Sequence, residues 1–341
     1  MNYRQFFIHS CIVVAWLTPL QDDAFSQSPL PTKRGALTVL KNKAEEPTPA
    51  RRPDTATPNL VAANSELEKS KTTMVSNAKS NPIEPTKAAE RIELRYRMKL
   101  GMKIVSEVTH LATTNTKIND ESQSSQSRSV SRKVWTVNDV AKNGDMTFVH
   151  QVDAVEMSQQ IGDGEELRFN SATDKEPNAI FQKVAETIGK PIATITINDF
   201  GQVIERSDEA AGSNLGMGDI TIPLPEGKID IGTQWETSRE IRVRRTDGTP
   251  KVVKVRELYT LEKVSAGVAV ISIRSEPLTP LSEPAVEAQA VQQMSNGTIR
   301  FDIDKGQLIS KNLKWDKTVV GFSGSGSVMD YSARLDEVVL K

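Results

Sequence analysis

From Arg91 onward, hydrophobic and polar residues alternate in short runs, which is the pattern of half-buried β-strands. The first run places four large apolar residues on one face: Ile92, Leu94, Tyr96 and Met98. Further alternation continues to Lys341, where the run 318–341 predicts terminal strands. The polar Ser/Gln stretch 119–128 breaks the alternation and predicts a loop. The ordered part of the chain should therefore be mainly β.

This alternating region contains an internal repeat. The segment 134–137, Val-Trp-Thr-Val, is echoed at 258–261 by Leu-Tyr-Thr-Leu. Each copy then reaches a Glu-Pro pair and ends in a strand, a tight turn and a second strand. Repetition of this kind predicts two copies of one supersecondary unit. We expect two tandem copies of a curved antiparallel β unit with about one helix each, a mainly β (α+β) fold of the β-sandwich type.

One helix per copy follows from the spacing of apolar residues. The segment 177–188 is the clearer case, with an apolar stripe at Ile180, Phe181, Val184, Ala185 and Ile188. In the second copy a weaker stripe begins at Pro284, and Asn296-Gly297 is expected to end that helix.

Strand register can be predicted at the hairpin of each copy. A two-residue turn at Asn143-Gly144 would pair Val137 with His150 and Trp135 with Val152, on one face with Phe148. A three-residue turn at 265–267 in the second copy would pair Tyr259 with Ile273 and Leu261 with Ile271.

The N-terminus has the features of an export signal. Arg4 precedes an apolar run over 6–20, and Ala24-Phe25-Ser26 fits a cleavage site. We expect residues 1–26 to be a signal peptide and 27–90 a disordered Pro/Thr/Ser/Lys-rich tether. This tether has no aromatic residue and holds eight of the 17 prolines. The first repeat would span 91–212, a linker and junction 213–230, and the second repeat 231–341, packed with the first.

Composition excludes several classes of chemistry. The only cysteine, Cys11, lies in the signal peptide, so the mature chain would have neither disulfides nor a thiolate nucleophile. A net charge of −1 argues against a nucleic-acid-binding protein. The apolar run is too short for a comfortable membrane span, so the mature chain should lack a transmembrane segment. No histidine spacing predicts a metal site, and no cofactor is expected.

The candidate site residues come from the predicted inner face. The mature chain has two histidines, His110 and His150, which align with isoleucines in the second copy. Such residues are core or pocket-wall groups more often than catalysts. The predicted sheet face and helix stripe would form an apolar pocket with one orienting polar group, lined by Trp135, Phe148, His150 and Phe181.

A second candidate site is basic. Arg242, Arg244, Lys254 and Arg256 fall on the polar faces of neighbouring strands and could form a stripe for an anionic lipid or polysaccharide. Glutamates are interspersed among them, so a neutralised solvent-facing surface is the alternative.

The paired pattern resembles a family of uncharacterised secreted proteins of planctomycete-type bacteria. The resemblance rests on the segments 132–137, 296–304 and 319–322 and covers about 91–341. It implies export but transfers no activity and no site residue. More loosely, a curved sheet with helices behind an export signal is similar to periplasmic lipoprotein carriers.

These features favour an exported envelope protein, periplasmic or extracellular, that binds an apolar ligand such as a lipid, or another envelope protein. A structural cell-surface protein and a hydrolase of envelope polymer are the alternatives. Enzymatic activity is not the favoured interpretation, because no catalytic residue set emerges from the sequence.

Overall fold

A computed structural model describes residues 38–40, 91–208 and 221–341 of the chain. Residues 91–208 and 221–341 belong to one compact unit, which is mainly β as the alternation predicted. The predicted signal peptide lies outside the described residues, and so does most of the predicted tether. None of the helices in the described ranges combines the length and apolar character needed to cross a bilayer.

Each repeat contributes five main strands and a short helix. The first repeat contains β3 (Lys103–Ile118), β4 (Glu121–Val140), β5 (Met146–Ile161), β6 (Leu167–Asn170), the 3-10 turn η1 (Ala179–Phe181), α1 (Gln182–Ala185), β7 (Pro191–Ile197) and β8 (Val203–Asp208). The second contains β10 (Gln234–Arg244), β11 (Pro250–Ser265), β12 (Val268–Pro277), α2 (Pro284–Ala290), η2 (Val291–Gln293), β13 (Asn296–Asp302) and β14 (Gln307–Val320). The remaining strands are β1 (Thr38–Leu40), β2 (Ile92–Glu93), β9 (Lys228–Ile229) and β15 (Ser327–Val339).

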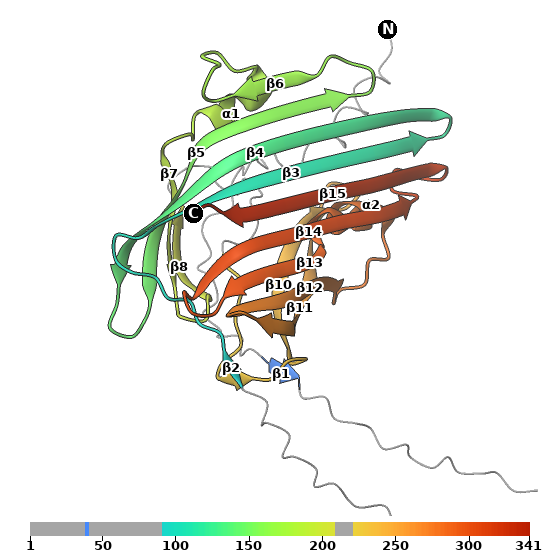
Figure 1. The fold of residues 1–341 in the computed structure, drawn as a ribbon. Coiled ribbons are helices and arrows are strands. Elements are labelled where there is room, and N and C mark those ends of the chain that lie inside the picture. The colour runs from blue at the N-terminus through green and yellow to red at the C-terminus, as the bar shows by residue number, and fades with distance from the viewer. Residues whose placement is uncertain (1–37, 41–90, 209–220) are drawn as a thin grey trace, which may run out of the picture. The chain divides into compact units, whose positions relative to one another are not determined.

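All the main strands join one antiparallel sheet. Its order is β1-β10-β11-β12-β13-β14-β15-β3-β4-β5-β7-β8, with β6 paired to β5. The order β10-β11-β12-β13-β14 thus matches β3-β4-β5-β7-β8, the strand order expected of two copies of one unit. Strand β15 belongs to neither copy and joins the two. The repeats thus form one continuous curved sheet instead of two separate sheets (Figure 1).

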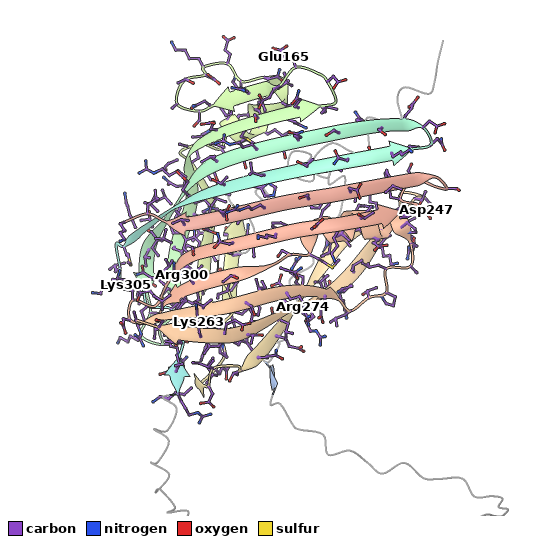
Figure 2. All side chains as sticks on the ribbon, turned by 45° about the vertical axis from the view of Figure 1, so that its right-hand side comes forward. Glu165, Asp247, Lys263, Arg274, Arg300 and Lys305 are labelled. Carbon is purple, nitrogen blue, oxygen red and sulfur yellow. The ribbon has the colours of Figure 1, made fainter. Side chains whose placement is uncertain are left out.

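The two faces of this sheet differ as the alternation requires. On β13, for example, Ile299 and Phe301 are buried while Arg300 between them is exposed. Figure 2 shows Lys263, Arg274 and Arg300 projecting from the outer surface of the strands. Apolar side chains gather on the inner face, where α2 covers the second repeat.

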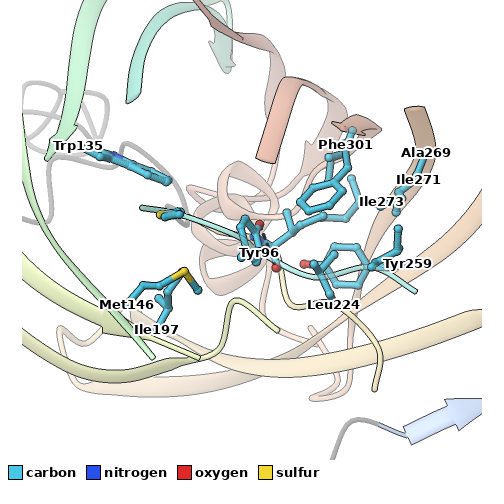
Figure 3. Packing of buried hydrophobic residues seen from close by; sticks show 14 of the residues in the cluster. Tyr96, Trp135, Met146, Ile197, Leu224, Tyr259, Ala269, Ile271, Ile273 and Phe301 are labelled. Atoms are coloured by element: carbon cyan, nitrogen blue, oxygen red, sulfur yellow. Dashed lines mark hydrogen bonds between the residues drawn. The ribbon is translucent and has the colours of Figure 1, made fainter. Parts of the chain in front are cut away.

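The two repeats share a core around an extended N-terminal segment. Residues 91–99 keep the alternation predicted for a strand, with Leu94, Tyr96 and Met98 buried, but only β2 pairs as a strand. The ring of Tyr96 packs edge-on against Phe301 at 5.3 Å. In Figure 3, Tyr96 lies between Trp135 of the first repeat and Phe301 of the second.

This segment also ties together the two equivalent tight turns. The Tyr96 amide donates to the Asp199 carbonyl at 2.7 Å, and the Arg97 amide donates to the Gly306 carbonyl at 3.0 Å. A side chain on Gly306 would meet the Arg97 amide nitrogen at 2.5 Å, and Gly306 has a φ of +65°. Glycine is therefore required there both for the turn and for the close approach of the segment.

The helices differ from the sequence-based expectation. The segment 177–188 forms only η1 and the four-residue α1, although Phe181 and Val184 are buried as the apolar stripe predicted. The longer helix is α2, which was expected to be the weaker one. Asn296-Gly297 does not end a helix but begins β13, where a side chain on Gly297 would meet the Asn312 carbonyl oxygen at 2.1 Å.

The register prediction was wrong in the first copy and right in the second. Trp135 pairs with His150, because the loop from Val140 to Met146 is wider than two residues and a bulge follows Val137. Tyr259 pairs with Ile273 as predicted, although a two-residue turn and a bulge after Leu261 produce that register.

The expected loop over 119–128 was also wrong. Only a tight turn at Asn119 and Asp120 separates β3 from β4, and the Ser/Gln stretch is strand from Glu121 onward. Hydrogen bonding to β3 on one side and, from Ser125, to β5 on the other overrides the low strand propensity of this composition. The glycine-rich segment 321–326 forms the hairpin turn between β14 and β15.

Candidate functional site

Three of the four predicted pocket residues come together on the inner face. Trp135 and Phe148 stack at 4.8 Å with an angle of 18° between their rings. His150 is the register partner of Trp135 and is 4% exposed. Burial lowers the pKa of His150 to about 4, and the nearby charges of Lys133 and Arg206 act in the same direction, so the imidazole is neutral at pH 7.

The fourth residue, Phe181, lies apart from these three. It stacks on Phe169 at 6.0 Å and belongs to a separate buried cluster with Val155 and Val184. Phe181 lines a cavity under α1 whose wall includes none of the other three residues. The sequence therefore predicted both parts correctly as inner-face positions, but the structure does not bring them into one pocket.

We call the space under α1 the outer cavity. It has a volume of about 80 Å³, whereas roughly 10–15 Å³ holds one water molecule. With its open side included, the space between its walls is about 820 Å³. Its apolar lining comes from β3, β5, β15 and the helix region, and includes Val108, Val152, Met157, Phe181, Val184 and Leu335. Its polar lining comes mainly from β3, β4 and β5 and includes His110, Ser127, Arg128, Ser129, Ser131 and Gln159, of which Arg128 is the charged residue.

The histidine on this cavity wall is His110. Its side chain is 5% exposed, and its ring meets that of Trp315 edge-on at 6.1 Å. Burial lowers the pKa of His110 to about 4, so this imidazole is also neutral at pH 7. The sequence predicted His150 as the single polar group of the pocket. In the structure, the histidine that lines the outer cavity is His110.

A row of buried charges crosses the sheet beside this cavity. Lys133 on β4 and Lys311 on β14 both pair with Glu337 on β15, at 2.9 Å and 3.2 Å. The hydroxyl of Ser106 on β3 donates to the same carboxylate at 3.0 Å. All four side chains point inward, and Lys133 is only 1% exposed. We refer to these four residues as the charged row.

The pKa values in the row follow from this geometry. Burial opposes the charged form of Glu337, but the ammonium groups of Lys311 and Lys133 outweigh burial and lower its pKa to about 2. Burial lowers the pKa of Lys133, and the Glu337 carboxylate opposes that shift. Glu337 is therefore charged at pH 7, and its carboxylate has to serve two ammonium groups.

The charged row separates the outer cavity from a smaller one. This inner cavity has a volume of about 20 Å³, enough for about one water molecule. Its wall includes Tyr96, Ile104, Trp135 and Val339 together with Lys311 and Glu337. On β4, Ser131 lines the outer cavity and Trp135 the inner one, and Lys133 lies between them on the same face.

The sequence analysis missed the charged row, although a signal for it was present. Lys133 is two residues from Trp135, and Glu337 is two residues from Leu335, so both are in phase with the apolar face of their strands. A charged residue in phase with buried apolar neighbours is uncommon and marks a group that needs a buried partner.

The predicted basic stripe lies on the outer face of β10 and β11. Arg256 is paired there with Glu236 at 3.3 Å and with Glu276 at 2.6 Å. Arg242, Arg244 and Lys254 are exposed. The four residues lie on one surface, and Glu236 and Glu276 neutralise the charge of Arg256.

Neither buried carboxylate has the surroundings of a general acid. Glu337 pairs with lysines, while Glu257 pairs with Arg239 at 2.8 Å and accepts a hydrogen bond from the Tyr259 hydroxyl at 2.8 Å. Across the described ranges, the His, Asp and Glu side chains do not gather in threes as a metal site would require.

Comparison with known proteins gives little further information. Neither a family model nor a curated protein matches the sequence. A solved structure of lipovitellin, described for its lipid–protein interactions, is similar with a TM-score of 0.40 and 7% identity. The match covers 72% of this chain and 26% of that one, so the chain spans about a quarter of the lipovitellin chain's length. A similarity of this degree supports no conclusion about ligand or activity.

Proposed function

We propose that this protein is an exported, non-catalytic binding protein that holds an apolar ligand in the outer cavity. The observation that carries the proposal is the cavity itself: an open, largely apolar space bounded by the sheet and a short helix. The signal peptide expected over 1–26 would deliver it to the periplasm or the cell exterior.

The second repeat acts as an internal comparison. There α2 and η2 are buried against the inner face through Val286, Ala288, Ala290, Val291 and Met294. In the first repeat α1 has only four residues and leaves the outer cavity beside it. The two copies share a strand order, so the shorter helix accounts for the open space.

Filling the cavity should remove binding without unfolding the protein. Val184 lines the outer cavity from α1, and a Val184→Phe substitution adds a ring that would occupy this space. We expect the affinity for a fluorescent fatty-acid probe to fall at least tenfold, with little change in Tm. The probe is titrated by fluorescence and Tm is measured by calorimetry.

Lys183→Phe is the matched control, because Lys183 is the exposed neighbour of Val184 on the same helix. This variant should bind the probe as wild type does. Equal probe binding by Val184→Phe and wild type, or no binding by wild type, would contradict the proposal. Phe181→Ala is a weaker test, because loss of its stacking on Phe169 costs stability as well.

A further inference from the structure

The two repeats differ at one buried charged position. Lys133 and Glu257 are equivalent, since each lies two residues before the echoed aromatic residue, Trp135 or Tyr259. Both side chains are buried on the inner face. In the second repeat Glu257 has its own cation, Arg239, at 2.8 Å. In the first repeat Lys133 shares a single carboxylate, that of Glu337, with Lys311.

Lys133 is therefore only partly compensated. Its Nζ atom lies 2.9 Å from the Glu337 carboxylate, and the described residues supply it with no second acceptor. An ammonium group buried to this degree is costly unless it is both paired and hydrogen-bonded. The second repeat shows that the same architecture can bury a charge with full compensation.

Lys133 also lies directly beside the floor of the outer cavity. Val152, its register partner on β5, and Ser131, two residues away on β4, both line that cavity. Val108 on β3 and Leu335 on β15 also line the outer cavity. Each lies two residues from a member of the charged row, Ser106 and Glu337 respectively. The cavity thus ends on β4 at the Ser131 hydroxyl, and Lys133 is the next inward-facing residue of that strand, behind the lining.

We propose that the ligand of the outer cavity is an anionic amphiphile, with its carboxylate or phosphate head at Lys133 and Ser131 and its apolar chain along Val184 and Phe181. This inference rests on the proposed function and adds the charge and orientation of the ligand. A bound anion supplies what Lys133 lacks, a second negative partner and hydrogen-bond acceptors. In the second repeat the equivalent charge is paired with Arg239 and the α2 residues are buried against the sheet, so we expect no such ligand there.

The test compares ligands that differ only in the head group. Binding of dodecanoate, dodecyl phosphate and dodecanol is measured by calorimetry on the wild-type protein and on Lys133→Met. Methionine keeps the length of the side chain and leaves Lys311 and Glu337 as a one-to-one pair. We expect wild type to bind an anionic ligand at least tenfold more tightly than dodecanol. Lys133→Met should lose this preference and retain dodecanol binding.

Lys314→Met is the control, because Lys314 is exposed on β14 and should leave every affinity unchanged. Lys133→Arg provides a second variant that keeps the charge and should keep the preference for an anion, whether or not Lys133→Met folds. The relative affinities of dodecanoate and dodecyl phosphate distinguish the two head groups.

Equal wild-type affinities for the acid and the alcohol would overturn the inference while leaving the proposed function intact. An anion preference that persists in Lys133→Met would also overturn it, and would place the head at the serine-lined side of the cavity. Failure of wild type to bind any of the three ligands would contradict the proposed function and this inference together.

Discussion

Replacement of His150 should remove about half of the protein's sensitivity to mild acid. The imidazole is buried on β5 opposite Trp135 of β4, and the charges of Lys133, Arg206 and Glu337 act on it. Its equivalent in the second repeat is Ile273, which is buried in the same sheet. His150→Ile therefore introduces the residue that this architecture already accepts at the equivalent position.

The size of the effect follows from the pKa of His150. Its value is about 4 in the folded protein and 6.5 for an ordinary histidine, so below pH 6.5 the unfolded chain binds a proton that the folded chain does not. Stability therefore falls as the pH drops from about 6.5 to about 4. Between pH 7 and pH 5 the loss is about 2 kcal/mol for one such histidine. His110, with the same lowered pKa, doubles this to about 4 kcal/mol.

Urea denaturation at pH 7 and pH 5, followed by tryptophan fluorescence, measures this loss. Glu337 interferes little, because its lowered pKa affects stability mainly between about pH 4.5 and pH 2. Wild type should lose about 4 kcal/mol, His150→Ile about 2 kcal/mol, and the double variant with His110→Ile almost nothing. A double variant that loses as much as wild type would refute the reasoning, because the buried neutral histidines could not then be the cause.

Two further predictions concern stability, each with its own control and both read from the free energy of unfolding. Gly306→Ala should cost more than about 2 kcal/mol, because it adds backbone overlap with Arg97 to the strain of a positive φ. The control is Gly248→Ala, which has a φ of +83° and open space around it and should cost only about 1–2 kcal/mol. Equal costs of the two substitutions would contradict the role of the N-terminal segment. Glu337→Gln should cost about 3–5 kcal/mol, because it removes the buried carboxylate that pairs with two ammonium groups. The control is Arg128→Ala, which removes an exposed pair with Glu156 and should cost at most about 1 kcal/mol. An equally mild effect of Glu337→Gln would show that the charged row is not compensated as described.

The sequence predicted which residues lie on each face of the strands. The pairing of neighbouring strands was predicted correctly in the second copy but not in the first. Trp135, Phe148 and His150 lie on the inner face as predicted, even though the pairing of Trp135 is shifted by two residues. A shift of two preserves the side-chain direction, so the apolar pattern is unaffected by it. The pattern contains no comparable information about a bulge or a wide turn, which depend on the neighbouring strands.

The lengths of the helices and the cavity could not be predicted, because both depend on tertiary packing. The stripe at 177–188 is strongly apolar, yet the segment forms only a 3-10 turn and a four-residue α-helix. The weaker stripe at Pro284 becomes the longer helix, since β10, β11, β14 and β15 offer it a larger apolar surface. Propensity is a weak guide when tertiary contacts of this size compete with it.

The duplication explains why the differences between the copies carry the functional information. Two copies of one unit, joined by β15 into one sheet, have by construction the same strand order and the same inner face. A requirement of folding alone would be expected to act on both copies alike. The first copy combines a four-residue helix, an open cavity, a neutral histidine where the second has isoleucine, and a lysine that shares its counterion. These four departures lie next to one another on β3, β4, β5 and α1, which is the arrangement expected if one copy supports the fold and the other binds the ligand.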